Sequence, residues 1–318
     1  MGLSWKMRNE AMYIFIVNPV SGNGRGLKVF QKLVKSTLYQ QLETKYYYTE
    51  YPGHAEKLAN EITAGNARDI KCIVIVGGDG TVHEVLNGLR DVKIPISFIP
   101  GGSGNDFGRG TKIMGSPIEI LKRIVNDESP LIYWKGHFIK DKEERYFINS
   151  IGFGFDAEIA KKANLSKYKN LLNKLRLGTL TYVIALIQVL IYFKPFVAEV
   201  ELDGEKKLLT DCWMVTIANH QYYGGGMKII PTAKIQPNII PVLIIHGISK
   251  WKVLGLFITV FTGKHIDFKE VDLYHVEELS IHISNPIYYQ VDGQTAFTNS
   301  CLIAKDKQTI QIMGSNFS

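Results

Sequence analysis

Three glycine-rich segments carry the residue types best suited to chemistry in this chain. They span residues 18–26 (NPVSGNGRG), 77–81 (GGDGT) and 100–106 (PGGSGND). Glycine has no Cβ, so backbone N–H groups in such segments can approach phosphate oxygens closely. One such segment is more often a tight turn, but three of them, carrying Asp79 and Asn105, favour a phosphate-binding site.

The glycine spacing excludes two common nucleotide motifs. No Gly-Lys-Ser or Gly-Lys-Thr closes the first segment, so it is not a Walker A loop. Gly22, Gly24 and Gly26 alternate, which does not fit the Gly-x-Gly-x-x-Gly dinucleotide fingerprint. We therefore expect a phosphate binder of another type.

Asp79 lies where a carboxylate would need a metal ion. A carboxylate beside a bound phosphate would repel it unless a cation lies between them. Mg²⁺ is usually bound by one or two carboxylates together with substrate phosphates. We expect Asp79 to organise Mg²⁺, directly or through water; capping of the following helix is the alternative reading.

These segments need a scaffold that brings them to one edge, and the first third of the chain predicts one. Apolar runs at 12–17, 43–49, 70–76 and 96–99 alternate with helical patterns at 28–41, 54–64 and 82–89. This order predicts a parallel sheet with helices on both sides. The glycine segments follow three of the strands, so they should line the crevice at the carboxyl ends of the sheet. The helix from about residue 82 should point its positive N-terminal end into that crevice.

The pattern changes near residues 127–130. From there on, strand-like segments enclose one long helical insert at about 171–193, and short β-branched runs then predict an antiparallel sandwich or barrel. The longest apolar stretch, 180–197, is interrupted by Gln188 and broken by Pro195. An amphipathic or buried helix is therefore favoured over a membrane span.

Composition is that of an ordinary globular protein. The 318 residues are 46% hydrophobic and 21% charged, which excludes a disordered, collagen-like or coiled-coil chain. The length predicts two domains or one large one. Lys and Arg outnumber Asp and Glu by 37 to 30. That balance favours an acidic partner, such as phosphates, nucleic acid or an anionic membrane surface, without choosing among them. The function expected below involves no nucleic acid. Three widely spaced cysteines indicate a reduced, intracellular protein.

A basic stretch between Lys161 and Arg176 precedes the long apolar helix. A solvated helix face and docking to an anionic membrane are equal alternatives for it. In the second case each Lys or Arg near the membrane adds about 1 kcal/mol of binding free energy. We expect a cytoplasmic protein that associates peripherally with membranes, and whether it forms a homodimer stays open.

In order and spacing, the three glycine segments resemble the three signatures of the diacylglycerol kinase catalytic domain family, which includes bacterial lipid kinases, sphingosine kinases and ceramide kinases. The resemblance covers most of the chain. It implies an α/β + β fold, with an N-terminal parallel α/β nucleotide domain and a C-terminal antiparallel β-sandwich domain for the lipid substrate. The first domain would comprise residues 1–131 with 297–318, and the second residues 132–296. ATP would lie in the cleft between them.

The resemblance also implies roles for individual residues. Those that match its nucleotide contacts are Asn18, Ser21, Gly22, Thr49, Gly77, Gly78, Asp79, Gly80, Thr81, His83, Ser103 and Asn105. Those expected near the lipid head group are Asp106, Asp156 and Gly225. Ser103 stands where many members of the family have Thr and keeps the hydroxyl. His83 could touch phosphate, and a helix-capping or solvated histidine is the alternative.

Two departures from the family pattern bear on catalysis. The family base is the Glu of an Asp-Gly-Glu run, but here Gln294 ends that run, and an amide is not basic. The carboxylates of a structural Mg²⁺ site are replaced by Gln236 and Asn238, whose neutral oxygens hold a dication less strongly. A general base is worth about 10²–10⁴ in rate, but the loose transition state of phosphoryl transfer asks little of one. Asp79 or Asp292 could therefore take the late proton.

We expect an ATP- and Mg²⁺-dependent lipid kinase that transfers the γ-phosphate to a lipid hydroxyl, with diacylglycerol as the leading substrate. Its catalytic positions would be Asp79, Asp292 and Gln294. One alternative is a non-catalytic nucleotide- or lipid-binding protein on the same scaffold. The other is a kinase for a soluble substrate such as NAD, because NAD kinases share the Gly-Gly-Asp-Gly loop.

Overall fold

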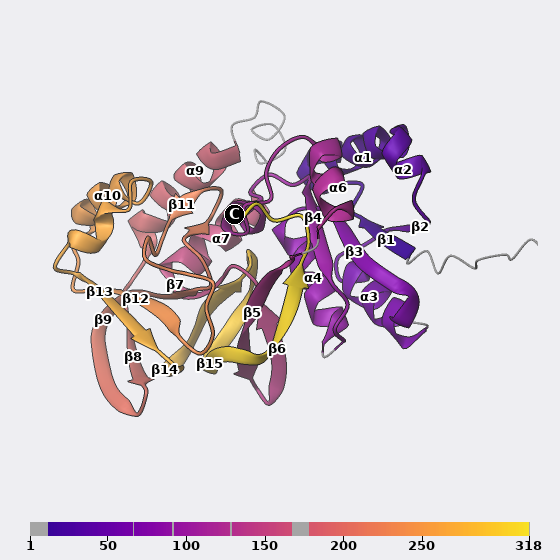
Figure 1. Ribbon diagram of the computed structural model, residues 1–318. Coiled ribbons are helices and arrows are strands. Elements are labelled where there is room, and N and C mark those ends of the chain that lie inside the picture. Colours follow the sequence, from indigo (N-terminus) through magenta and orange to yellow (C-terminus); the bar gives the residue numbers. More distant parts are fainter. Residues whose placement is uncertain (1–11, 66, 91, 128, 167–177, 318) are drawn as a thin grey trace, which may run out of the picture.

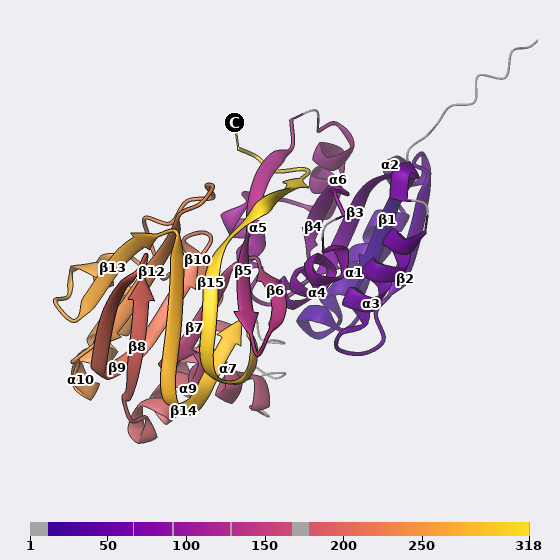
Figure 2. The ribbon, with the colours of Figure 1, turned by 90° about the horizontal axis from the view of Figure 1, so that it is seen from below.

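Figure 1 shows the computed structural model of the chain, and Figure 2 shows it turned by 90°. The structure describes residues 12–65, 67–90, 92–127, 129–166 and 178–317. Two parts lie side by side. In the N-terminal part helices flank a sheet, and the C-terminal part consists mainly of long strands with a few helices on one side (Figure 1).

Strands and helices alternate in the N-terminal part. Its elements are β1 (Met12–Val17), α1 (Ser21–Val34), α2 (Thr37–Gln40), β2 (Thr44–Tyr48), α3 (His54–Ala64), a 3-10 turn (Ala67–Asp69), β3 (Ile70–Gly77), α4 (Asp79–Leu89), β4 (Ile96–Pro100), α5 (Asp106–Gly110) and α6 (Pro117–Val125). The strands pair in parallel in the order β2-β1-β3-β4. The predicted parallel sheet is confirmed.

The two central strands of this sheet form because they can be buried on both faces. Residues 14–17 of β1 and 73–76 of β3 are apolar, mostly β-branched and almost without solvent exposure, as expected for a parallel sheet covered by helices. α1 starts with left-handed backbone at Gly22, Asn23 and Gly24 (φ 56°, 58° and 83°). The first glycine segment is thus a loop, and regular helix follows it.

Antiparallel strands dominate the C-terminal part. Its elements are β5 (Leu131–Lys140), β6 (Glu143–Phe147), β7 (Ser150–Gly154), α7 (Phe155–Leu165), α9 (Gly178–Tyr192), β8 (Phe196–Leu202), β9 (Glu205–Ala218), β10 (Tyr222–Tyr223), β11 (Met227–Lys228), β12 (Ile240–His246), α10 (Lys250–Thr259), a 3-10 turn (Lys264–Asp267), β13 (Val271–Val276), β14 (Glu278–Val291) and β15 (Gln294–Ile312). The predicted antiparallel architecture is confirmed.

The pairing of these strands closes on itself. β7 and β8 each pair with both β9 and β14, along different lengths of those two long strands. The enclosed core contains apolar side chains such as Val200, Ile217, Val242 and Ile281. The other face of β9 and β12 packs on α7, α9 and α10 through a separate apolar cluster.

β15 connects the two parts. It pairs with β14 and β5 in the C-terminal part, and its last residue, Ile312, pairs in parallel with Ile96 of β4. The end of the chain therefore returns to the N-terminal sheet.

Several elements differ from the sequence-based expectation. α7 and α10 are helices that the strand-like patterns did not predict. Not all strands are short: β14 is continuous from Glu278 to Val291, with a register shift against β15 between His282 and Ile287. Most of the expected helix at 171–193 appears as α9, and residues 171–177 lie outside the described residues. Within the described ranges, none of the helices combines the length and the apolar composition needed to cross a bilayer.

Candidate active site

The three glycine segments meet at the carboxyl ends of β1, β3 and β4. A Cβ on Gly22 would lie 2.2 Å from the carbonyl oxygen of Gly101, so the first and third segments touch there. A Cβ on Gly102 would lie 2.5 Å from Cα of Gly78, so the third segment also touches the second. Side chains would not fit at these contacts, and this explains the need for glycine.

Two asparagines hold the glycine segments in shape. Asn18 Nδ2 donates to Thr81 Oγ1 at 3.1 Å, which links the first segment to the second. Asn105 has left-handed backbone (φ 56°) and makes two 3.0 Å hydrogen bonds with the backbone of Gly102. The sequence singled out Asn18 and Asn105 as nucleotide contacts, and their side chains are engaged within the loops.

Asp79 and Asp106 form an acidic pair beside the glycine segments. Asp79 is the first residue of α4, and its Oδ1 accepts the N–H of Phe107 at 2.8 Å. Asp106 Oδ2 accepts the N–H of Gly225 at 2.7 Å. A Cβ on Gly104 would lie 3.0 Å from Asp79 Oδ2 and 3.6 Å from Asp106 Oδ2, so both carboxylates border the same small space.

The surroundings disfavour two negative charges in this pair. Burial, followed by the charge of Asp106, raises the pKa of Asp79 to about 6. Burial also raises the pKa of Asp106, against the opposing effect of the Gly225 N–H and the Arg109 guanidinium. A cation between the two carboxylates would relieve their repulsion.

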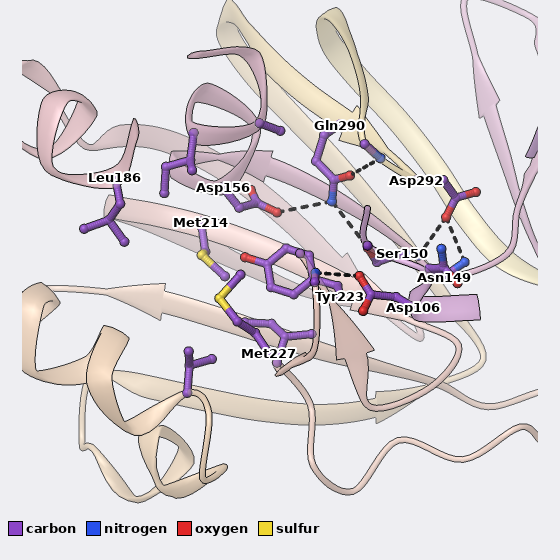
Figure 3. Close-up of a pocket in the computed structure, with 18 of the residues that line it drawn as sticks. Asp106, Asn149, Ser150, Asp156, Leu186, Met214, Tyr223, Met227, Gln290 and Asp292 are labelled. Atoms are coloured by element: carbon purple, nitrogen blue, oxygen red, sulfur yellow. Dashed lines mark hydrogen bonds between the residues drawn. The ribbon is translucent and has the colours of Figure 1, made fainter. Parts of the chain in front are cut away.

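A cavity of about 360 Å³ extends from the acidic pair into the C-terminal part (Figure 3). Its polar lining residues include Asp79, Ser103, Asp106, Asp156, Gln290 and Gln294. Its apolar lining residues include Phe155, Leu186, Met214, Met227, Leu256 and Phe257. In Figure 3, Leu186, Met214 and Met227 lie toward one end, and Asp106, Asn149 and Asp292 lie toward the other. One cavity therefore joins a polar, acidic end to an apolar end.

Asp156 lies in the cavity wall at the start of α7. Its Oδ1 accepts the N–H of Ala157 at 2.9 Å, and its Oδ2 accepts from Thr216 Oγ1 at 3.2 Å. Oδ2 also accepts from Gln290 Nε2 at 3.4 Å (Figure 3). Burial raises its pKa to about 6 despite these donors. A buried carboxylate in this setting can accept a hydrogen bond from a hydroxyl group of a bound molecule.

Asp292 is surrounded by donors. Its Oδ1 accepts the N–H groups of Asn149 and Ser150 at 2.7 and 3.1 Å, and its Oδ2 accepts the N–H of Ile148 at 2.9 Å. The fourth partner is His83 Nδ1, 2.8 Å from Oδ2. Both oxygens of this buried carboxylate are thus used to hold structure together. The expected role of Asp292 as a proton acceptor gains no support from these contacts.

The contacts of His83 also give no support to the phosphate contact suggested from the sequence. The side chain is buried, with Nδ1 toward Asp292 and Nε2 3.4 Å from Asn87 Nδ2. An imidazole so placed links α4 to the β14–β15 turn, and a contact with phosphate remains only an expectation from the sequence.

The cavity brings together many, but not all, of the residues singled out from the sequence. Those that line it are Gly78, Asp79, Gly80, Ser103, Asp106, Asp156, Gly225, Asp292 and Gln294. Those outside the lining are Asn18, Ser21, Gly22, Thr49, Gly77, Thr81, His83 and Asn105. Thr49 is nevertheless close to the first segment, because its N–H donates to the carbonyl of Val17 at 2.9 Å.

Gln236 and Asn238 lie between β11 and β12, outside the cavity lining. Within the described part of the chain, no group of three or more His, Cys, Asp or Glu side chains is arranged to hold a metal ion. Loss of the structural Mg²⁺ site at these two positions stays a prediction.

Sequence reasoning missed two polar residues of the site. Gln290 bridges Asp156 and the N–H of Gly293, and it lies near the end of β14, just before the turn that contains Asp292. Arg109 donates through Nη1 to Asp106 Oδ1 at 2.8 Å, one helical turn further along. That helical spacing could have indicated Arg109 once Asp106 was chosen, but no local pattern indicated Gln290.

Family models match both parts of the chain. Residues 12–132 match the diacylglycerol kinase catalytic domain, and residues 149–310 match the YegS C-terminal NAD kinase beta sandwich-like domain. The fold class expected from the sequence, an α/β domain followed by a β-sandwich domain, is confirmed by these matches.

Individual proteins match over nearly the whole chain. The Bacillus subtilis (strain 168) protein named "Putative lipid kinase YtlR" is 33% identical over 94% of this chain and 98% of its own length. A diacylglycerol kinase of Mycobacterium tuberculosis (strain H37Rv) is 25% identical over 94% and 93%. The crystal structure of a diacylglycerol kinase from Bacillus anthracis str. Sterne has a TM-score of 0.65 at 18% identity and covers 95% of this chain and 96% of that one, which shows a shared fold. The chain belongs to the diacylglycerol kinase catalytic domain family.

Proposed function

We propose that the protein is an ATP-dependent lipid kinase that transfers the γ-phosphate to a lipid hydroxyl, with diacylglycerol as the substrate. The observation that carries this proposal is the polarity of the cavity. Asp106 lies at one end, and Leu186, Met214 and Met227 lie toward the other (Figure 3). A diacylglycerol has the matching division, because a free hydroxyl and ester groups lie at one end and acyl chains at the other.

The acidic pair fits a magnesium ion. Two carboxylates, Asp79 and Asp106, border one space. Burial raises the pKa of both, and the charge of Asp106 adds to the rise at Asp79. Mg²⁺ commonly takes one or two carboxylates and completes its shell with water and phosphate oxygens. Bound there, the ion would neutralise charge on the phosphates.

The chain's own groups would position the reactants. Backbone N–H groups of the glycine segments, together with the N-terminal end of α4, would hold the phosphates. The lipid hydroxyl would approach from the polar wall that contains Asp156 and Gln290. A bond would form between the lipid oxygen and the γ-phosphorus while the bond from that phosphorus to the bridging β,γ-oxygen breaks, leaving ADP.

The hydroxyl proton needs an acceptor other than Gln294, because an amide is not basic. The sequence offered Asp79 and Asp292. Asp292 already accepts four hydrogen bonds, three from backbone N–H groups and one from His83. Of these two residues, the contacts therefore favour Asp79 as the acceptor.

A second candidate function is nucleotide or lipid binding without catalysis. The observation in its favour is Gln294, which lines the cavity where the family has a glutamate. A kinase for NAD fits less well, because the apolar end of the cavity offers few partners for the polar groups of a dinucleotide.

A reduced cytoplasmic setting agrees with the buried free thiols of Cys72, Cys212 and Cys301.

The test of substrate class is phosphate incorporation from γ-labelled ATP with Mg²⁺ into three acceptors: diacylglycerol in vesicles, a crude lipid extract and NAD. We expect label in diacylglycerol and in one lipid of the extract, and none in NAD. Label in NAD alone would contradict the proposal. ATP binding without label in any acceptor would favour the non-catalytic alternative.

A further inference from the structure

Two helices cover the apolar end of the cavity. Leu186 of α9 and Val253, Leu256 and Phe257 of α10 contribute to its lining. Both figures place α9 and α10 on the same side of the C-terminal sheet (Figures 1 and 2). The layer between the cavity and the outside is therefore one helix thick on this side.

The outward faces of the same two helices carry exposed apolar side chains. Ile191 and Tyr192 at the end of α9 are 59% and 82% exposed, and Trp251 and Ile258 of α10 are 84% and 72% exposed. Trp251 and Ile258 are seven residues apart, so they share one face of α10. We call these four residues the roof patch.

A hydrogen bond shows that the two halves of the roof patch are neighbours. Lys250 Nζ donates to the backbone carbonyl of Ile191 at 2.6 Å. The end of α9 therefore touches the start of α10, and Trp251 follows Lys250 directly. Large apolar side chains grouped in this way on one face mark an interaction surface.

Positive charge lies beside the roof patch. A second cavity, between α7, α9 and the β14–β15 hairpin, is lined by Tyr192 of the patch and by Lys161, Lys162 and Lys194. Glu158 is the acidic residue in that lining. Lysines next to exposed Trp and Tyr suit an anionic bilayer, where the rings lie at the headgroup level and the lysines meet acidic headgroups.

We propose that the roof patch and the adjoining lysines dock the protein on an anionic membrane and place α9 and α10 against the bilayer. This proposal rests on the proposed function, because it gives the apolar end of the cavity a source of acyl chains. The acyl chain would then pass from the bilayer into the cavity across one layer of helix. The bilayer suits the surface better than a second copy of the chain does, since the patch adjoins several lysines that two symmetric copies would bring together.

The test measures co-sedimentation with vesicles of phosphatidylglycerol and phosphatidylcholine (1:1), and with phosphatidylcholine alone. The variant Trp251→Glu/Ile258→Glu changes two exposed side chains that do not line the catalytic cavity. The matched control is Leu208→Glu in β9, near its turn with β8, where the leucine is also exposed, at 67%. Phosphorylation of a short-chain diacylglycerol dispersed in detergent, and the thermal midpoint, are measured on all three proteins.

We expect the wild type and Leu208→Glu to bind the mixed vesicles and to bind phosphatidylcholine more weakly. The double variant should lose about tenfold or more in vesicle affinity. Its activity on the dispersed substrate and its thermal midpoint should match the wild type.

Vesicle binding of the double variant equal to that of the wild type would overturn the proposal. So would a wild-type dimer that the double variant converts to a monomer with unchanged vesicle binding, since the patch would then join two copies. If the wild type binds vesicles as expected but never phosphorylates the dispersed lipid, the proposed function fails while the docking surface stands.

Discussion

His83 Nδ1 lies 2.8 Å from Asp292 Oδ2, and this contact joins α4 to the turn between β14 and β15, just before Gln294. The same carboxylate accepts three backbone N–H groups of residues 148–150, at the start of β7. Three chain segments far apart in sequence therefore meet at one buried charge. Asp292 is better described as a structural centre of the site than as a proton acceptor.

Replacing Asp292 by alanine should be strongly destabilising. The change would leave the N–H groups of residues 148–150 without their acceptor, and removing one partner from a buried charged network costs about 3–5 kcal/mol. The measurement is the free energy of unfolding in urea.

Asp203 provides the matched control for this change. It also has positive φ (49° against 50° for Asp292), also precedes a glycine in a hairpin, and accepts two backbone N–H groups at 2.9 Å, but it is exposed. Asp203→Ala should lower the free energy of unfolding by about 1 kcal/mol. Equal losses of unfolding free energy for the two variants would show that burial and the His83 contact add nothing to the stabilising effect of Asp292.

Gly22→Ala should damage the proposed nucleotide site more than Gly24→Ala. Both glycines have positive φ, so both substitutions carry backbone strain of about 1 kcal/mol. A Cβ at Gly22 would in addition meet the carbonyl of Gly101 at 2.2 Å, whereas nothing lies within 4 Å of one at Gly24. Calorimetry with ATP and Mg²⁺ should show about a tenfold or greater loss of affinity for Gly22→Ala. Equal affinities for the two variants would mean that the first and third segments need not touch.

Asp156 should make stability depend on pH. Burial raises its folded-state pKa from 3.8 to about 6, so between these values the folded protein binds more protons than the unfolded chain. The contribution of Asp156 to the free energy of unfolding therefore falls by about 3 kcal/mol in total as the pH rises from about 4 to 6. The free energy of unfolding of Asp156→Asn should fall less over that range than that of the wild type.

Asp203→Asn, at an exposed carboxylate, is the control for the pH experiment and should keep the slope of the wild type. Parallel curves for the wild type and Asp156→Asn would contradict the assigned pKa shift.

The parts of the site that follow local rules could be predicted from the sequence. The glycine segments were located because β-branched runs such as 70–76 mark buried strands, and loops at the ends of parallel strands must converge. The role of Asp292 was missed because its partners at residues 148–150 lie more than 140 residues away, and no local pattern reports such a contact.

α10 shows a second limit of predicting structure from the sequence. Its sequence, KWKVLGLFIT, carries β-branched and aromatic residues that can fit a strand. The helix places Val253 and Leu256 toward the apolar cluster under it and leaves Trp251 outside. Tertiary packing over the cavity, which the sequence does not display, decides between the two structures.

Gln294→Glu should raise the rate of lipid phosphorylation. The side chain lines the cavity, and a carboxylate there could accept the hydroxyl proton, an effect worth about 10²–10⁴ in rate. Gln308→Glu, which adds the same charge at an exposed position of β15, should leave the rate unchanged. No gain for Gln294→Glu, with ATP binding intact, would favour a protein that binds without catalysis.

The most direct test of the account is transfer of label from γ-labelled ATP to a purified short-chain diacylglycerol, followed by extraction into an organic phase. With Mg²⁺ the wild type should move label into that phase, and Asp203→Asn should do the same. Asp79→Asn should lower the rate by about a hundredfold or more, because it removes a charge of the proposed metal site. Label that stays in the aqueous phase with folded, ATP-binding wild type, or undiminished transfer by Asp79→Asn, would contradict the account.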